Sequence, residues 1–253
     1  MTSNTDKFST PARVRVTDWM ACGVGLESRE DWISWLHGEK NPRHDSAPVA
    51  ATLPSMLRRR ISVIGQMAFR ASYALSENST ARFIFCSRHG EFQRTLNILT
   101  SLAAQQPVSP AEFSLSVHNA LAGLLSIGWK NTAGHTTIAA GADSFGSAML
   151  DAIACLNSQP SEPVMLVYFD DLLPAPYDEF ADDGETCVAL ALLLSSPHDD
   201  GGDLTLAFQP RSRDATPLSA SGQALDFLRF MLSGEPARTS IGERLQWRWQ
   251  RSA

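Results

Sequence analysis

The sequence of 253 residues lacks the features that mark several large classes of protein. Its formal charge of −6 offers no concentrated basic surface, which a general nucleic-acid binder needs to displace counterions from phosphates. It has no long uncharged apolar run, and its first residues, MTSNTDKFSTPAR, lack the apolar core of a signal peptide. We therefore expect no nucleic-acid partner, no membrane span and a cytoplasmic location.

Cysteine is scarce and scattered. The four cysteines are Cys22, Cys86, Cys155 and Cys187. None belongs to a C-x-x-C pair or lies beside a histidine at the spacing of metal ligands. We expect four buried, reduced thiols that behave as small hydrophobic side chains, with no metal site and no cofactor.

Two charged clusters have ordinary interpretations. In the acidic stretch Asp170 to Asp183, prolines and apolar residues interrupt the carboxylates, whereas a calcium loop needs alternating oxygen ligands around a glycine. We expect a solvated acidic loop there. The run Arg58–Arg60 fits either a docking site for an acidic partner such as a carrier protein or a solvated helix end with one or two ion pairs, which is the more common arrangement.

Most of the chain alternates between strand and helix periodicity. The predicted strands are 12–19, 81–88, 136–140, 161–171, 185–196 and 203–210, and the main predicted helices are 57–76, 90–104, 144–156 and 222–232. A further helix is expected between its N-cap, Ser28, and its stop, Gly38. Such alternation is typical of an α/β fold with a mainly parallel sheet that is covered by helices on both faces.

The domain organisation follows from this pattern. Residues 1–11 are expected to be disordered, residues 12–213 to form the main domain, and residues 214–253 to form a tail with a helix and a Trp/Arg-rich end. That end, LQWRWQR, fits an edge strand, a clamp on a partner or, most commonly, a packed terminus.

The stretch TTIAAGADSFGSAMLDAIACL, from Thr136 to Leu156, predicts a strand, a tight turn and a helix. This geometry can expose a nucleophile at the start of a helix, where backbone N–H groups and the helix dipole favour negative charge. One hypothesis is a serine hydrolase in which Ala142–Gly146 is a degenerate G-x-S-x-G elbow, with Ser144, Asp170 and His198 as the triad. Against it, His198 lies in the hydrophilic turn SSPHDDGGD, and no HGGG-type oxyanion loop is evident.

A second hypothesis rests on a resemblance that covers most of the chain. The stretches EDWISWLHG, RRRIS, SRHGE, SPAEFSLSVHNALAGLLSI and YFDDLLPAPY resemble the β-ketoacyl-synthase-like N-terminal family of the thiolase-like superfamily. Within it the chain is similar to the short chain-length-factor-like subunits that partner the ketosynthase of aryl polyene pathways. The resemblance implies half of a thiolase-like fold, built as three αβα layers around a mainly parallel mixed sheet.

The resemblance also implies that this chain is catalytically silent. The cysteine nucleophile of ketosynthases falls on Ala142, and a methyl group cannot form a thioester. The strand and helix series ends near Pro210, so the second half that carries the paired catalytic histidines of ketosynthases is not expected. Neither His118 nor His135 is therefore carried over as catalytic. The implied partner is an active β-ketoacyl synthase, with an acyl carrier protein as an indirect partner.

In this family two subunits pack about the strand that leads into the elbow. We therefore expect the interface in 136–140 and in 109–128. The interface candidates are His118, Asn119, Thr136, Thr137, Ile138, Ala139 and Ala140. Candidates for the wall of an acyl tunnel are Phe113, Leu115, Leu121, Leu124, Leu125 and Phe145, each of which fits an ordinary core position equally well.

Overall fold

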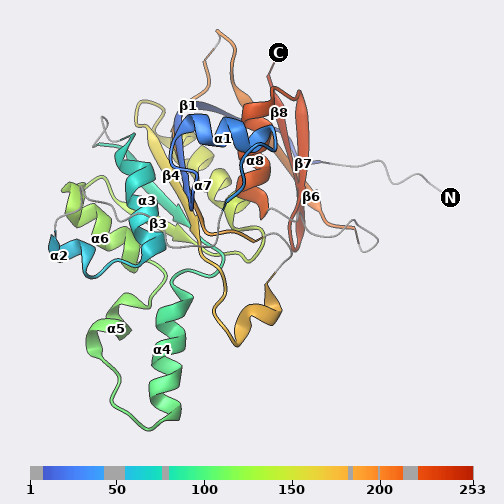
Figure 1. Cartoon of the computed structure of the whole chain (residues 1–253). Helices are drawn as coiled ribbons and strands as arrows, with labels where there is room; N and C mark the ends of the chain where they lie inside the picture. Colours follow the sequence, from blue (N-terminus) through green and yellow to red (C-terminus); the bar gives the residue numbers. More distant parts are fainter. Residues whose placement is uncertain are drawn as a thin grey trace.

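The computed structural model describes residues 8–42, 55–75, 80–181, 185–198, 200–212 and 222–252. Their strands form one sheet in the order β3-β2-β4-β5-β1-β6-β8-β7 (Figure 1). The strands are β1 (Ala12–Gly23), β2 (Arg82–Cys86), β3 (His135–Ile138), β4 (Val164–Asp170), β5 (Val188–Ser195), β6 (Leu204–Pro210), β7 (Ala237–Ile241) and β8 (Leu245–Arg251). The helices are α1 (Arg29–Leu36), α2 (Ser55–Arg58), α3 (Val63–Tyr73), α4 (Phe92–Ala103), α5 (Pro110–Leu115), α6 (Ala120–Trp129), α7 (Ser144–Ser158), the 3-10 helix η1 (Tyr177–Phe180) and α8 (Gly222–Ser233).

Helices cover both faces of the sheet, which confirms the three-layer αβα arrangement. Side chains alternate between the faces of a strand, so neighbouring residues of β2 enter different cores. Ile84 and Cys86 join a core with α1, α7 and α8, whereas Phe83 and Phe85 join a core with α3 and α6. The α/β prediction is therefore correct for the layers.

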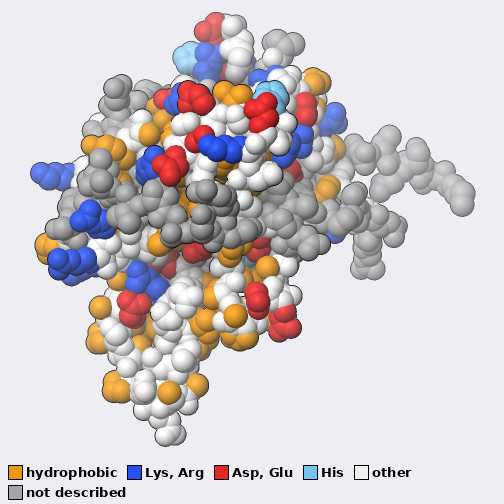
Figure 2. Space-filling view, in the orientation of Figure 1, with side chains coloured by type: hydrophobic (Ala, Val, Ile, Leu, Met, Phe, Trp, Pro, Cys, Tyr) orange, Lys and Arg blue, Asp and Glu red, His pale blue; other side chains and the backbone are white. Residues whose placement is uncertain are grey.

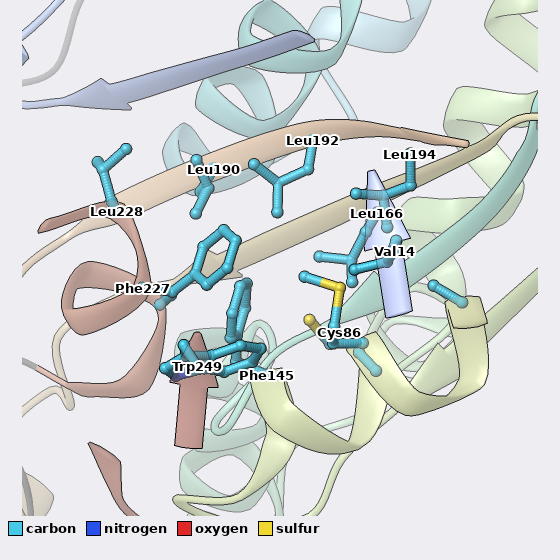
Figure 3. Close-up of a cluster of buried hydrophobic side chains, with 14 of the residues drawn as sticks. Val14, Cys86, Phe145, Leu166, Leu190, Leu192, Leu194, Phe227, Leu228 and Trp249 are labelled. Atoms are coloured by element: carbon cyan, nitrogen blue, oxygen red, sulfur yellow. The ribbon is translucent and has the colours of Figure 1, made fainter. Parts of the chain in front are cut away.

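Aromatic rings fill the core between α7, α8 and β8 (Figure 3). The ring centroid of Phe227 lies 5.3 Å from that of Phe145 and 4.8 Å from that of Trp249. All three side chains are almost completely buried. The tail that contains Phe227 and Trp249 is thus packed against the start of α7.

The sheet is mixed, but fewer of its pairings are parallel than the sequence predicts. In the described residues, β2 is parallel to both β3 and β4, and the other pairings are antiparallel. The reason is that β5 follows β4 without a crossover helix and therefore returns beside it in the opposite direction. In addition, β7 and β8 form a hairpin. The expectation of a mainly parallel sheet is wrong in this respect.

Both ends of the expected main domain continue into the same sheet. Residues 1–7 lie outside the described part of the chain, but Ser9 is placed: its N–H donates to the Phe208 carbonyl of β6 at 2.7 Å, and its hydroxyl accepts from Phe208 N–H at 3.1 Å. At the other end, β8 pairs with β6 and β7 and buries Trp247 and Trp249. Thus Ser9 pairs with β6, and LQWRWQR is a packed inner strand.

The sequence predicts the start of a helix correctly where a capping side chain is present. Ser28 caps α1 by accepting a hydrogen bond from Asp31 N–H, and Gly38 follows the helix with φ of +76°. The single helix predicted over 57–76 is instead divided into α2 and α3. The division occurs because the Ser62 side chain accepts from Gly65 N–H and so begins a new helix.

Within the described residues, no helix has the length and apolar character needed to span a membrane.

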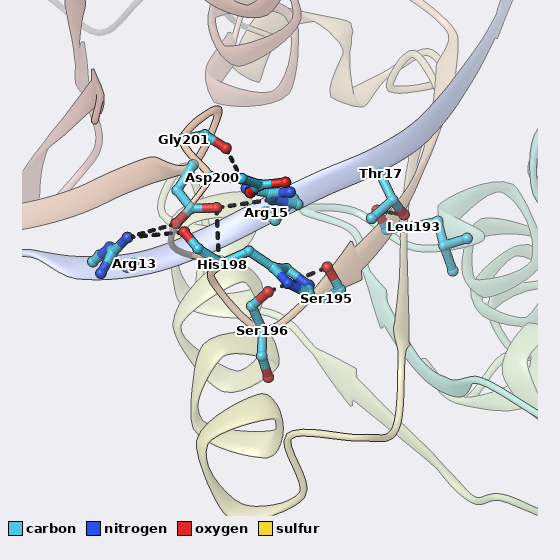
Figure 4. A network of polar contacts seen from close by, with 10 residues as sticks. Arg13, Arg15, Thr17, Leu193, Ser195, Ser196, His198, Asp200 and Gly201 are labelled. Carbon is cyan, nitrogen blue, oxygen red and sulfur yellow. Dashed lines mark hydrogen bonds and ion pairs between the residues drawn. The ribbon is translucent and has the colours of Figure 1, made fainter. Parts of the chain in front are cut away.

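The buried Asp203 carboxylate holds the turn between β5 and β6 against β1. Figure 4 shows His198, Asp200 and Gly201 of this turn beside Arg13 and Arg15 of β1. Asp203 accepts from Arg13 at 2.7 Å, from Arg15 Nε at 2.9 Å and from His198 N–H at 3.4 Å. Burial alone would raise the pKa of Asp203, but the hydrogen bonds from Arg15, His198 and Arg13 outweigh it and hold that pKa below its ordinary value of 3.8. The charged form of Asp203 therefore stabilises the fold.

We predict that Asp203→Asn lowers the free energy of unfolding at pH 7 by about 1.5–3 kcal/mol, the typical value of hydrogen bonds to a charged group. Because the folded pKa is lowered, this difference is complete above about pH 4 and shrinks as the pH falls further. Urea denaturation of both proteins at pH 7 and pH 3 measures it. Asp200→Asn is the matched control, since Asp200 is exposed, and should change little. An equal loss in both variants would contradict a specific role for Asp203.

Candidate functional site

The strand, turn and helix predicted from the sequence are present, and they form a tight elbow. β3 leads into a turn at 139–143, and α7 begins at Ser144. Gly141 has φ of +59°, a left-handed conformation that glycine adopts at little cost. The Ser144 hydroxyl donates to the Gly141 carbonyl at 2.7 Å and accepts from Ala140 N–H at 2.9 Å. Ser144 is buried and holds the turn together.

The structure separates the three residues of the hydrolase hypothesis. Asp170 ends β4 and pairs with Val188 at the start of β5, whereas His198 lies beyond the other end of β5. β5 has eight residues and therefore spans about 25 Å. His198 cannot act as the base for Ser144, and the serine-hydrolase hypothesis is wrong.

Asp170 has a structural role at the edge of the site. Its carboxylate accepts four hydrogen bonds of 3.1 Å each, from Ser87 Oγ, Arg88 N–H, His89 N–H and the Tyr168 hydroxyl. Burial raises the pKa of Asp170 above its ordinary value, although the bond from His89 N–H opposes that rise. The carboxylate is buried inside the protein, so the expectation of a solvated loop does not hold for Asp170; residues 182–184 of that loop lie outside the described part.

A small cavity of about 60 Å³ lies between the elbow, the end of β4 and the start of α8. Its volume holds a few water molecules. The lining residues are Arg88, Gly141, Ala142, Ser144, Phe145, Tyr168, Asp170, Asp171, Glu185, Thr186, Val188, Gly222, Gln223, Ala224, Leu225 and Ile241. No histidine is among them, and this cavity is too small for a long acyl chain.

The hairpin of β7 and β8 covers the elbow from the other side. Asp143, directly before α7, is buried and accepts from Trp247 Nε1 at 2.7 Å and from Arg244 N–H at 2.8 Å. A Cβ atom on Gly141 would collide with the Glu243 carboxylate, and one on Gly242 would overlap the Asp143 carboxylate. The hairpin turn therefore lies directly against the elbow.

The start of α7 receives a further side chain from α8. Gly146 N–H donates to the Gln223 side-chain oxygen at 3.0 Å, and the Trp247 ring packs against Gly146 so closely that a Cβ atom there would lie 2.5 Å from it. Sequence reasoning missed these contacts. Gln223 lies 77 residues from Gly146, and Trp247 lies 104 residues from Asp143; local patterns do not reveal such distant pairs.

The expected interface residues lie at one edge of the sheet. β3 pairs with β2 on one side and is the terminal strand of the sheet. Thr136, Thr137, Ile138 and Ala140 are half-buried, and Ala139 is exposed. Within the part of the chain that the structure describes, the strand thus presents a free backbone edge.

The other expected interface residues precede α6. His118 is half-buried and its ring lies against Gly90, whose φ is +63°, while Asn119 is exposed. His135 at the start of β3 is also exposed.

The six tunnel-wall candidates do not share one surface. Leu121, Leu125 and Phe145 are buried in the cores of this chain. Leu115 and Leu124 are half-buried, and Phe113 is 62% exposed. Phe113 alone among the six is open enough to contact another protein extensively.

Comparison with known protein families identifies the family of this chain. The family described as "Beta-ketoacyl synthase, N-terminal domain" matches residues 32–250. The chain belongs to this family. A search of curated proteins finds no match.

Solved structures agree with the family. A chain of a ketosynthase (ApeO) in complex with its chain length factor (ApeC) from Xenorhabdus doucetiae is 30% identical, with a TM-score of 0.82; the match covers 94% of this chain and 99% of that chain. A β-ketoacyl synthase from Burkholderia phymatum is 13% identical, with a TM-score of 0.56, and covers 89% of this chain and 71% of its own. The ishigamide ketosynthase/chain length factor is 16% identical, with a TM-score of 0.52, over 74% of this chain and 59% of that chain. The latter two show the thiolase-like fold.

We predict that Asp143→Ala destabilises this family member by about 2–3 kcal/mol, because the buried Trp247 Nε1–H and the backbone N–H of Arg244 lose their acceptor. Asp143→Asn should cost less, since its amide oxygen still accepts one of the two bonds. Urea denaturation followed by tryptophan fluorescence measures both variants. Equal stability of the wild type and the alanine variant would show that the hairpin is held by other contacts.

Proposed function

We propose that the chain is a non-catalytic, chain-length-factor-like subunit that pairs with an active β-ketoacyl-acyl-carrier-protein synthase in polyene or polyketide-type lipid biosynthesis. One observation carries the proposal: alanine occupies the elbow of a ketosynthase fold whose similarity extends over 99% of a chain in a ketosynthase and chain-length-factor complex. The partner would perform the decarboxylative condensation of malonyl units on a carrier protein.

Catalytic silence is supported by the chemistry at the elbow. A cysteine at the start of α7 would become a thiolate readily, because a helix N-terminus lowers the pKa of a thiol. Ala142 has only a methyl group there. Ser144 already bonds to the turn, and the lining of the nearby cavity contains no histidine for acid–base chemistry. These features leave no described group at the elbow to accept an acyl chain.

Pairing through β3 is supported by its position at the sheet edge. An unpaired edge strand is a template for association and is normally protected in a stable protein. β3 has no charged side chain, and Ala139 next to it is exposed. A partner strand or helix at this edge would protect it.

The proposed contribution to an acyl tunnel also requires the partner. The cavity of about 60 Å³ beside the elbow is too small for an acyl chain, so a tunnel that begins at a catalytic elbow would lie in the ketosynthase or at the interface. This chain would stabilise the partner and supply part of the wall, with the exposed Phe113 as the best-placed candidate. The carrier protein would meet the complex through the ketosynthase.

We predict that co-expression with the ketosynthase encoded nearest to this chain yields a stoichiometric heterodimer in size exclusion with light scattering. Ile138→Asp should abolish it, because an unpaired charge in an interface costs about 3–5 kcal/mol. Ile138 also contacts the core of its own chain, so Ala139→Arg, at an exposed position, is the second variant. Ile33→Asp on α1 is the exposed control and should leave the complex intact. An unchanged complex with both β3 variants would refute the interface.

We further predict that a cerulenin-like electrophile labels only the ketosynthase in the purified complex. The isolated chain should not consume malonyl-carrier protein, and neither should its Ala142→Cys variant, because no histidine lines the cavity. Mass spectrometry and a decarboxylation assay measure both properties. Turnover by the isolated wild-type chain would overturn the assignment as a silent subunit.

A further inference from the structure

Asp151, on α7, has a carboxylate oxygen without a hydrogen-bond partner in the described part of the chain. The residue is half-buried, and this oxygen, Oδ2, is fully buried. A buried carboxylate oxygen without a donor is costly, so such a group is expected to find its complement elsewhere. Rotation about the last torsion of the side chain exchanges the two oxygens, so a donor that arrives from outside can bind either of them.

Asp151 lies on the side of α7 that faces β3. The Ser144 hydroxyl marks this side, because it accepts from Ala140 N–H, just after β3, at 2.9 Å. Asp151 follows Ser144 by two helical turns and so returns to nearly the same side of the helix, about 10.5 Å along the axis. α7 also contacts β3. The Asp151 carboxylate therefore flanks the sheet edge on which the proposed pairing takes place.

The level of Asp151 along β3 follows from the chain connection. β3 and β4 are both parallel to β2, so α7 must bring the chain back along the sheet before β4 begins. A strand advances about 3.3 Å per residue, so two turns of α7 correspond to about three residues of strand. Counted back from Ala140, this places Asp151 level with Thr137, near the middle of β3.

Pairing of two copies of this chain through β3 would bring two Asp151 side chains together. An edge strand can pair with the same strand of a second copy about a two-fold axis, which passes through the middle of the pairing. This axis is perpendicular to the sheet, so both α7 helices stay on one face of the joined sheet. The two Asp151 carboxylates then face each other at the level of the axis, and like charges in an interface disfavour association.

Arg82, a cation on β2, does not remove this conflict. Its guanidinium donates to Thr136 Oγ1 at 3.4 Å. Arg82 precedes the residue that pairs with His135 at the start of β3, so it lies about 10 Å before Asp151 along the strand direction. The axis at mid-strand would place the Arg82 of a second copy equally far away in the other direction. A second copy therefore supplies a carboxylate, and no cation, opposite Asp151.

We propose that Asp151 selects the partner of the β3 edge: it disfavours a second copy of this chain and favours a ketosynthase surface that presents an arginine or lysine at the matching position. This inference rests on the proposed function and deepens it, because it states the chemistry that the partner must supply. A cation there would form an ion pair with Asp151 and satisfy the oxygen that lacks a donor among the described residues. Such a repulsive element is a common source of specificity between similar partners.

The first test uses this chain alone and needs no ketosynthase. Wild type and Asp151→Lys should each be monomeric in sedimentation velocity, because like charges meet in either self-pair. Their equimolar mixture should dimerise with a dissociation constant at least 100-fold lower than that of either protein alone, because a carboxylate then faces an ammonium group. Asp151→Asn should self-associate at least tenfold more tightly than the wild type, with an unchanged circular dichroism spectrum.

Glu39→Lys is the matched control. Glu39 is exposed just after α1, where Figure 2 shows acidic and basic side chains interspersed, so solvent and salt screen a change of charge there. A mixture of this variant with the wild type should stay monomeric. The role of Asp151 would be overturned by a wild type that dimerises by itself, or by a mixture with Asp151→Lys that associates no more than its components.

The second test measures the complex with the co-expressed ketosynthase by diluting it in mass photometry. Asp151→Lys should raise the dissociation constant at least 100-fold, and Glu39→Lys should leave it unchanged. Equal affinity of the wild type and Asp151→Lys would overturn the cation expected on the partner and leave the pairing itself intact. If the wild type forms no complex, the ketosynthase is the wrong partner and the proposed function fails, whereas the mixing experiment still decides whether Asp151 excludes a second copy.

Discussion

The buried Asp143 carboxylate is the interaction on which the candidate site depends. It lies between the elbow turn and the β7–β8 hairpin and accepts from the Trp247 ring and from Arg244 N–H. A charged acceptor in a buried position is strongly destabilised unless such donors surround it. The hydrogen bonds to this carboxylate hold β7 and β8 against the start of α7. The aromatic core of Phe145, Phe227 and Trp249 lies beneath that contact.

The same arrangement covers the elbow on the side of the hairpin. A catalytic elbow must leave its tip open to substrate and must keep donors free for developing charge. Here the hairpin turn packs against Gly141, and Gln223 bonds to Gly146 N–H. The proposed loss of catalysis would therefore involve more than the replacement of one cysteine by Ala142. The proposed function would then depend on surfaces such as the β3 edge and not on the elbow.

Much of the fold could be predicted from local patterns, because strands and helices impose their own periods on apolar residues. The elbow, the cap at Ser28 and all the expected strands are present. The sheet directions could not be predicted in the same way, since antiparallel β5 depends on a connection without a crossover helix. The Asp143 contact also escaped prediction, because its partners lie about a hundred residues away. The split between α2 and α3 shows how one side chain, Ser62, can outweigh an otherwise continuous helical pattern.

The candidate site was predictable in position but not in detail. The elbow and β3 lie where the sequence indicates, yet Leu121, Leu125 and Phe145 belong to the interior of this chain. The exposed apolar side chains of α4 and α5, among them Leu99, Leu102 and Phe113, have a consequence for the cell. An uncovered apolar surface of this kind is open to chaperones and proteases. If the proposed partner covers it, cells that make this chain in excess would lose the surplus, and the ratio of the two chains during synthesis would be under selection.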